Sequence, residues 1–325
     1  MFNVNHMRPF LNANGESKVV VNGQVLNTNA VATLRYQDWL DIDREVVRVA
    51  TKRLVGIQDL MSRGLTYSLG SIGITMSMFE RESDMTGAEV TMAPETETEM
   101  DRLNYDTQQV PVPFIHKDFK INARAMAAAA AHGSSLDVST VATATRKVSE
   151  KSEEMLFSGS AVKVDGSNAV YGYTNHPDRN TVSLTLTWTD GTKTGAQIVA
   201  DVLAMVAASR ADRMFGPWVL YIPGTYESVL DNDYKPGTSD NRTIRERILA
   251  INGIEEIKVA DQLANANVLL VQLTRETVDL AIGQDITTIQ WDEKGGLVSK
   301  YKVLACWAPR VKSEFDGRCG VVHLS

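Results

Sequence analysis

Apolar residues recur at intervals of three and four between residues 36 and 64, which predicts an amphipathic helix. Acidic residues crowd its first turns and basic residues its last turns, as the helix dipole favours. Gly64 marks the predicted end of the helix. The apolar stripe consists of Trp39, Ile42, Val46, Val49, Leu54, Ile57 and Met61.

A second helix is predicted from Ser134 to about Phe157, because a capping sequence opens it and Gly159 closes it. Apolar residues, including Val141, Val148 and Leu156, supply one side. The charged residues predict a side in contact with water, and they are Arg146, Lys147, Glu150, Lys151, Glu153 and Glu154.

Between these helices the pattern changes to a period of two, which predicts strands on either side of a polar segment. One strand runs over residues 72–79 and the other over residues 110–121, where a change of parity suggests a bulge. Pro111 and Pro113 exclude a central strand, since proline removes a donor from the ladder. Residues 65–122 are therefore predicted to form a long edge hairpin that reaches another molecule.

Residues 160–283 alternate strand-like and helix-like segments, which predicts an α+β domain. A hairpin follows over residues 284–308, and a strand ends the chain. Near the start, Asn22-Gly23 lies between apolar runs, the strongest short signal for a hairpin. The expected organisation is an arm (1–35), the first helix (36–64), the extended hairpin (65–122), the second helix region (123–159), the α+β domain (160–283), a hairpin (284–308) and a return strand (309–325).

The charge is concentrated in one segment. The chain has 33 Lys and Arg residues against 40 Asp and Glu residues. Two basic and nine acidic residues lie between Glu80 and Asp106, so the rest of the chain carries 31 of each sign. A neutral body argues against a dedicated nucleic-acid binder. The acidic segment is either a solvated loop or a loop that meets a basic patch on another subunit.

Composition excludes several other classes of protein. With 43% hydrophobic and 22% charged residues the 325-residue chain is neither disordered nor collagen-like. No apolar run is long enough to cross a membrane, and residues 1–6 lack the pattern of a secretory signal. Two cysteines, Cys306 and Cys319, are too few for a disulfide framework or a four-ligand zinc site. These features predict a soluble intracellular protein.

A search for catalytic patterns yields none of the expected constellations. There is no G-x-S-x-G elbow, and the histidines are not spaced as metal ligands. Residues 191–195 resemble half of a phosphate loop, although a turn that caps the next helix is the better interpretation. We therefore expect no catalytic, cofactor or metal site and no enzyme. An enzyme of an unrecognised type stays as a third alternative, because any acidic chain offers paired carboxylates.

The order of these parts, with four stretches of sequence, resembles the Hong Kong 97 capsid fold of tailed-phage major capsid proteins and bacterial encapsulins. Trp39-Leu40-Asp41-Ile42-Asp43 looks like the first helix of encapsulin-like shells. Residues 112–121 look like the descending strand of the extended loop, and residues 135–159 look like the spine helix. Ile282-Gly283-Gln284-Asp285 is similar to the junction that returns to the peripheral domain.

The resemblance implies an α+β fold with an N-terminal arm, an extended loop, a peripheral domain with a long spine helix, and a central axial domain. The implied function is assembly, as the major capsid protein of a tailed double-stranded DNA bacteriophage. The alternative is the shell protein of an encapsulin that encloses a cargo enzyme. Expected partners are further copies in pentamers and hexamers, packaged DNA bound without sequence specificity, and separate scaffolding, portal and decoration proteins. The expected location is the virion capsid, assembled in the host cytoplasm without a membrane.

Some shells of this kind are welded by an isopeptide bond from a lysine of the extended loop. No lysine lies between Lys52 and Lys117, so we expect a shell without that cross-link. A ladder of bands after boiling in detergent under reducing conditions would contradict this. The candidate contact residues are the acidic tip, the arm turn, the first-helix tryptophan and the spine charges, each with a solvated face as its alternative. They are Glu80, Arg81, Glu82, Asp84, Glu95, Glu97, Glu99, Asp101, Asn22, Gly23, Trp39, Arg146, Lys147 and Lys151.

Overall fold

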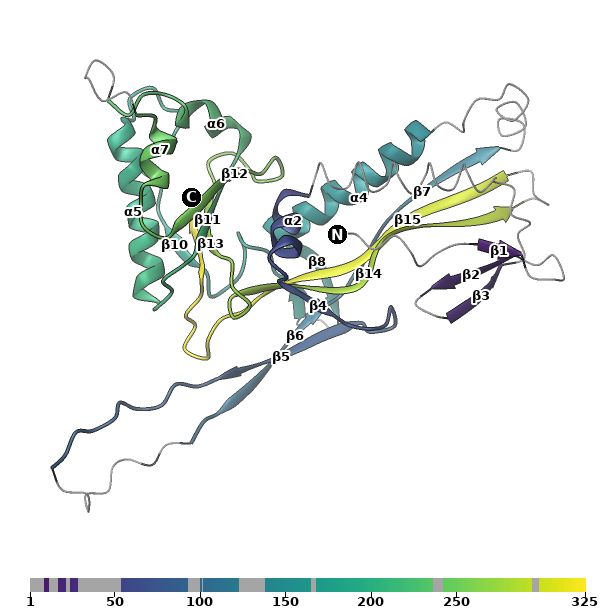
Figure 1. The fold of residues 1–325 in the computed structure, drawn as a ribbon, viewed down its shortest axis with the longest axis horizontal. Helices are drawn as coiled ribbons and strands as arrows, with labels where there is room; N and C mark the ends of the chain where they lie inside the picture. Colours follow the sequence, from purple (N-terminus) through teal and green to yellow (C-terminus); the bar gives the residue numbers. More distant parts are fainter. Residues whose placement is uncertain are drawn as a thin grey trace. The chain divides into compact units, whose positions relative to one another are not determined.

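The computed structural model divides the chain into two compact units (Figure 1). Unit 1 consists of Met1–Thr75, Val112–Phe157 and Leu280–Pro309, and unit 2 of Met76–Pro111, Ser158–Asp279 and Arg310–Ser325. The structure describes residues 9–11, 17–21, 24–28, 54–92, 100, 102–122, 138–164, 168–235, 242–293 and 298–325.

Unit 1 contains a four-stranded sheet in the order β4-β14-β15-β7. Its strands are β4 (Thr66–Ser68), β14 (Val278–Glu293), β15 (Val298–Val311) and β7 (Phe114–Asn122). The hairpin predicted over residues 284–308 is confirmed in position, but its strands are longer. Strand β14 begins before the predicted boundary at residue 284, and β15 continues beyond residue 308.

Two helices of unit 1 correspond to the predicted ones. Helix α2 spans Val55–Ser62 and ends before Gly64, whose φ of 69° confirms the predicted stop. The rest of the predicted first helix, over residues 36–53 and including Trp39, lies outside the described residues. Helix α4 spans Val138–Ser158 and is followed by Gly159 at φ 73°, again as predicted.

A separate three-stranded antiparallel sheet lies in the arm of unit 1, formed by β1 (Pro9–Leu11), β2 (Ser17–Val21) and β3 (Gln24–Thr28). Val21 pairs with Gln24, so the predicted hairpin with its two-residue connection is confirmed. The sequence did not predict β1, the third strand of this sheet.

Unit 2 begins with a two-stranded antiparallel ribbon, formed by β5 (Met76–Glu82) and β6 (Tyr105–Pro111). The ribbon is shorter than the hairpin expected over residues 65–122, since β4 and β7 pair within the four-stranded sheet instead. The predicted bulge is a break in the strand. Pro111 and Pro113 cannot donate to a ladder, and Val112 between them donates to the Thr75 carbonyl at 2.9 Å.

The remainder of unit 2 is built on a five-stranded mixed sheet in the order β10-β16-β13-β11-β12 (Figure 1). These strands are β10 (Asn180–Val182), β16 (Val321–Leu324), β13 (Val268–Gln272), β11 (Trp218–Ile222) and β12 (Ile254–Val259). Helices α5 (Gly195–Ala211), α6 (Gly224–Leu230) and α7 (Ile244–Leu249) pack their apolar residues against it. The short hairpin of β8 (Ser160–Val164) and β9 (Asn168–Val170) lies against β6.

The turn at residues 191–195 caps helix α5, which confirms the preferred interpretation of this stretch. Thr194 caps α5, and its hydroxyl accepts from the backbone N–H of Gln197 while the Gln197 side chain accepts from the backbone N–H of Thr194. The core beneath contains Trp188, Val202, Trp218 and Leu270.

No helix among the described residues is long and apolar enough to cross a membrane.

Candidate functional site

The ribbon of β5 and β6 has two different faces. Along β5 the side chains of Ser77, Phe79 and Arg81 are buried or half-buried, whereas Met78, Glu80 and Glu82 are exposed. This alternation follows from the period of two in a strand. One face therefore contacts the rest of unit 2, and the other face is exposed.

Arg310 fixes the inner face where the ribbon begins. Its guanidinium forms two hydrogen bonds with the Asp279 carboxylate, each at 2.5 Å, and a third with the Ser77 hydroxyl at 2.9 Å. The same guanidinium lies over the ring of Phe79, 5.8 Å from its centre. Lys312 adds an ion pair to Asp279 at 2.7 Å. All charges of this buried cluster thus have partners, as burial requires.

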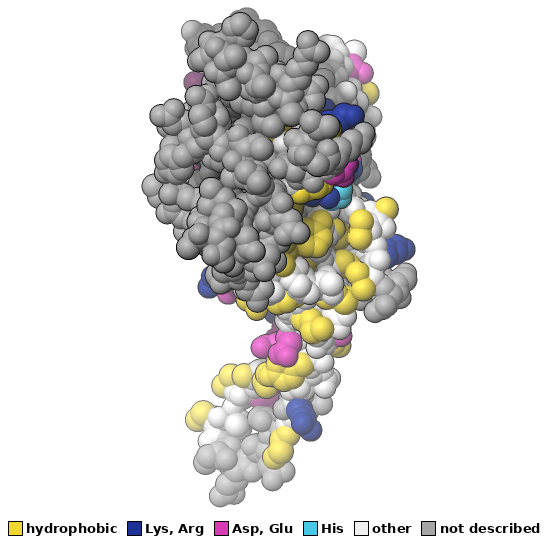
Figure 2. All heavy atoms as spheres, turned by 90° about the vertical axis from the view of Figure 1, so that its right-hand side faces the viewer, with side chains coloured by type: hydrophobic (Ala, Val, Ile, Leu, Met, Phe, Trp, Pro, Cys, Tyr) yellow, Lys and Arg dark blue, Asp and Glu magenta, His cyan; other side chains and the backbone are white. Residues whose placement is uncertain are grey.

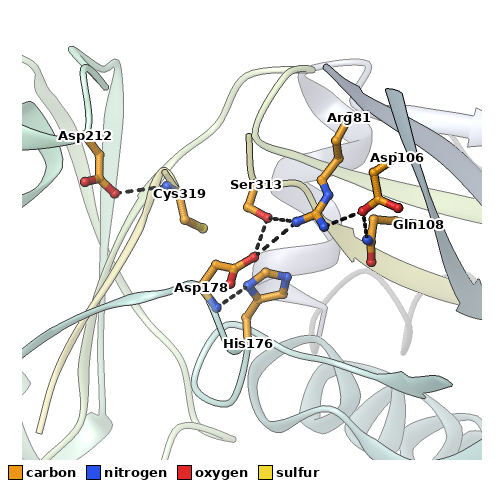
Figure 3. Close-up of polar contacts among 8 residues, drawn as sticks. All are labelled: Arg81, Asp106, Gln108, His176, Asp178, Asp212, Ser313 and Cys319. Atoms are coloured by element: carbon orange, nitrogen blue, oxygen red, sulfur yellow. Dashed lines mark hydrogen bonds and ion pairs between the residues drawn. The ribbon is translucent and has the colours of Figure 1, made fainter. Parts of the chain in front are cut away.

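Arg81 occupies the middle of the inner face and joins three segments (Figure 3). It donates to Asp106 on the opposite strand at 2.6 Å, to the Ser313 hydroxyl at 3.1 Å and to Asp178 at 3.4 Å. The Ser313 hydroxyl in turn donates to Asp178 at 2.6 Å. The Arg81 hydrogen bond, followed by one from Gln108, lowers the pKa of Asp106 below its ordinary value.

His176 lies beside this cluster and is uncharged at neutral pH. Burial lowers the pKa of His176 to about 4; the carboxylate of Asp178 opposes this shift, and the charges of Arg81 and Arg179 add to it. The backbone N–H of Asp178 points to its Nδ1 at 3.3 Å (Figure 3). Further along the chain than Ser313, the backbone N–H of Cys319 donates to the carboxylate of Asp212 at 3.0 Å. These bonds order the two segments that receive Arg81.

The third contact lies where β5 has ended. Asp84 pairs with Arg213 at 2.9 Å and approaches Arg318 at 3.6 Å. The backbone N–H of Met85 and then the Arg213 side chain lower the pKa of Asp84. All of these side chains are at least partly exposed, so the pairs are open to water and salt.

The outer face and the segments beyond the strands combine apolar and acidic groups. Figure 2 shows hydrophobic side chains, in yellow, along this part of the chain. Within the part of the chain that the structure describes, neither Glu80 nor Glu82 lies in an ion pair. The exposed apolar residues are Met78, Met85, Val90, Met92, Met100 and Tyr105. Exposed methionines and aromatic groups are typical of surfaces that bind a partner.

The spine charges form pairs within α4. Lys147 contacts Glu150 at 2.8 Å, Arg146 lies 3.7 Å from Glu150, and Lys151 contacts Glu154 at 2.8 Å. Pairs of this kind stabilise a helix surface slightly. They do not test the predicted inter-subunit role of Arg146, Lys147 and Lys151, which stays a prediction.

Other predicted contact residues lie outside the described part of the chain, namely Glu95, Glu97, Glu99, Asp101, Asn22, Gly23 and Trp39. The structure instead adds four residues that sequence patterns did not indicate: Asp178, Asp279, Arg310 and Ser313. Each is distant from the ribbon in sequence, and no spacing rule links them to it.

Among the residues that the structure describes, no group of three or more His, Cys, Asp and Glu side chains could hold a metal ion. Both cysteines are buried, and burial raises the pKa of each thiol, that of Cys319 to about 12. Thiolate chemistry at neutral pH is disfavoured at both positions.

Comparison with solved structures defines the class of fold. The chain is similar to the virus-like particle from Pyrococcus furiosus, with a TM-score of 0.61 and 16% identity over 88% of this chain and 99% of that one. It is also similar to the capsid of Myoviridae phage XM1, with a TM-score of 0.65 and 11% identity over 83% and 91% of the two chains. The protein therefore has the α+β Hong Kong 97 capsid fold, as the sequence resemblance predicted.

Residues 28–324 match the model described as "Family of unknown function (DUF6260)", so the chain belongs to that family. A curated relative is the type 1 encapsulin shell protein EncA of Myxococcus xanthus (strain DK1622). It is 28% identical over 257 residues, which cover 78% of this chain and 82% of the relative.

Proposed function

We propose that the protein is the structural subunit of a closed icosahedral shell. The observation that carries this proposal is the ribbon, whose inner face is bonded to its own unit while its outer face exposes apolar and acidic groups. A surface of that composition gains stability when a second copy covers it. The fold supports the same interpretation, since both structural relatives are named as shells or particles.

In the proposed assembly, the ribbon lies over a neighbouring copy. The axial domain (residues 160–283, with the return strand 309–325) meets other copies at the five- and sixfold axes, and the peripheral domain with α4 tiles the shell. Such contacts join different surfaces of two identical copies, so they must close into symmetric rings. Pentamers and hexamers are the expected units.

Charge complementarity supports β7 as a place where the acidic ribbon of a neighbour binds. Lys117 and Lys120 of β7 are exposed and, among the described residues, neither lies in an ion pair. The double variant Lys117→Glu with Lys120→Glu is expected to abolish assembly, and combining it with Glu80→Lys and Glu82→Lys to restore it. Lys163→Glu reverses an exposed lysine of β8 and serves as the matched control. Failure of the combined variant to restore assembly counts against this contact.

For the contents of the shell, we propose packaged double-stranded DNA and the role of a phage major capsid protein. The acidic ribbon and the arm of residues 1–35 support this choice, because both lengthen the reach between subunits. Separate scaffolding, portal and decoration proteins are then the partners, and the virion is the location. The similarity to EncA favours the second candidate, an encapsulin shell around a cargo enzyme.

Sedimentation and nuclease protection test the two candidates. Particles produced in the native host are separated from free subunits by sedimentation, treated with nuclease and analysed for DNA and protein. Protected double-stranded DNA supports the phage capsid, and one abundant co-sedimenting enzyme without DNA supports the encapsulin. A subunit that sediments only as a monomer or small ring under both conditions contradicts the shell.

A further inference from the structure

The three polar contacts that β5 and Asp84 make with the rest of unit 2 differ in their burial. At the start of the ribbon the side chains of Arg310 and Asp279 are 4% and 5% exposed. In the middle Arg81 is 18% exposed, and beyond the strand Asp84 is 53% exposed. The contacts are therefore most buried at Ser77 and become more exposed to solvent toward Asp84.

This gradient gives the contacts different strengths. The buried, bidentate pair with Asp279 fixes the Arg310 guanidinium, which contacts the ribbon through a buried hydrogen bond to the Ser77 hydroxyl and through the ring of Phe79. The Arg81 contacts with Asp106 and Asp178 are half-exposed, so salt weakens them. The ribbon thus has a buried contact, protected from salt, at its start and a partly exposed contact, sensitive to salt, in its middle.

Arg81 connects the ribbon to two other segments of unit 2. Asp106 belongs to the ribbon itself, but Asp178 lies in the turn after β9 and Ser313 in the segment before β16. The hydrogen bond from Ser313 to Asp178 holds these two acceptors together. The Arg81 guanidinium therefore contacts Asp178 and Ser313 in other segments of unit 2. These two contacts restrict the movement of the ribbon.

We propose that Arg81 is a salt-releasable latch that sets the direction of the ribbon, with the Arg310–Asp279 pair as its fixed pivot. Released from Asp178 and Ser313, the ribbon turns about its first residues and the distal part samples many directions. The latch is a property of a single chain. Its consequence for assembly, one defined direction of contact and one shell size, rests on the proposed function.

Distance measurement between two spin labels tests the latch directly. One label is placed through Tyr105→Cys on the exposed side of the ribbon, and the other through Ser228→Cys on the exposed surface of α6. The native cysteines are buried and remain unlabelled. Labelled full-length chain is diluted with excess unlabelled chain, so that only distances within one chain are observed.

At low salt the wild-type background is expected to give one narrow distance peak, which broadens in about 1 M salt, where the Debye length falls to about 3 Å. Arg81→Gln should lose the narrow peak even at low salt. Arg81→Lys keeps one charge without the planar fork and should recover part of it. Arg102→Gln, which removes an exposed arginine from the same hairpin, should match the wild type.

Two outcomes overturn the latch: a narrow peak in Arg81→Gln at low salt, or a wild-type peak that high salt leaves unchanged. Circular dichroism of each variant checks folding, and Asp178→Asn replaces Arg81→Gln as the test if that variant misfolds. Electron microscopy of the same variants distinguishes a failure of the proposed function from a failure of the latch. Absence of shells from the wild type, when it is produced together with the other proteins of its own assembly, contradicts the proposed function, whereas uniform shells from Arg81→Gln contradict only the assembly consequence of the latch.

Discussion

The Glu153 carboxylate accepts a hydrogen bond from the backbone N–H of Gly56 at 2.6 Å, across 97 residues of sequence. The N–H of Ile57 points to the other oxygen at 3.4 Å. Leu54, the N-cap residue of α2, supplies no side-chain cap of its own. The long helix α4 therefore provides the acceptor that the first turn of α2 requires.

The charge of Glu153 makes this contact sensitive to pH. Burial, with a smaller contribution from the carboxylate of Asp59, raises the pKa of Glu153 to about 7, although the N–H groups of Gly56 and Ile57 lower it. The carboxyl group of Glu153 therefore binds its proton more tightly in the folded state than in the unfolded state. The resulting stability is complete below about pH 4.5 and is lost as the pH rises through about 7.

Glu153→Gln, which is neutral at every pH, should remove that dependence. Relative to wild type, its free energy of unfolding should rise by up to about 3 kcal/mol between acidic and neutral pH. Urea unfolding across that range, with hydrogen exchange at Gly56 and Ile57, measures the difference. Parallel pH curves for the two proteins would show that Glu153 does not carry the effect.

Gly56 permits the close approach of the two helices. A Cβ atom at this position would lie 2.7 Å from Leu156 Cδ2 and 3.2 Å from Phe157 Cζ. Gly56→Ala should therefore destabilise the protein by about 1–3 kcal/mol through overpacking. Gly87→Ala is the matched control, because a Cβ atom there meets nothing within 4 Å. Equal stability of both variants in thermal unfolding would refute the tight contact.

Two histidines of unit 2 should respond to acid in the opposite sense. Burial lowers the pKa of His176 and of His323 to about 4. His323 Nε2 lies 2.8 Å from Asn267 Oδ1, and Arg179 donates to its Nδ1 at 3.3 Å, which requires a neutral ring. The stability that each neutral ring contributes is present above about pH 6.5 and is lost as the pH falls toward 4.

For each histidine the loss should reach up to about 3 kcal/mol. His323→Gln should flatten part of the acid side of the unfolding curve, whereas Glu153→Gln should make that side steeper, because Glu153 and the histidines act in opposite senses over nearly the same pH range. Chemical unfolding between neutral pH and about pH 4 distinguishes the variants. An acid limb that is unchanged in His323→Gln would contradict the assignment.

Trypsin should report whether the ribbon is covered. The only basic residues between Glu80 and Asp106 are Arg81, held by three partners, and the exposed Arg102. Isolated subunits should be cut first after Arg102, giving two large fragments, and assembled particles should resist. Mass spectrometry of a digestion time course measures this. Equal cleavage at Arg102 in both states would show that assembly leaves this segment exposed.

Local patterns were enough to predict the elements that periodicity and caps specify. Gly64 and Gly159 ended helices as expected, and Asn22-Gly23 correctly indicated a hairpin. The limits of the ribbon were not predictable, because the alternation continues through Pro111 and Pro113 while the pairing partner changes from β5 to β15. Only tertiary pairing decides where one sheet ends and another begins.

The contacts that position the ribbon were harder to predict for a related reason. Arg81 was identified as a candidate residue, but its partners Asp178 and Ser313 lie 97 and 232 residues further along the chain. Glu153 was predicted to lie on the side of the helix in contact with water, and this was wrong. Glu153 is buried, because it accepts a hydrogen bond from the first turn of α2 instead of contacting solvent.

The most direct test of the shell is electron microscopy of the purified protein, combined with the absorbance ratio that detects nucleic acid. Uniform icosahedral particles, filled or hollow, are the predicted result, and nucleic acid within them would favour the phage capsid over the encapsulin. If the protein, produced together with the other proteins of its own assembly, yields only monomers or one small symmetric ring, the proposed function is contradicted.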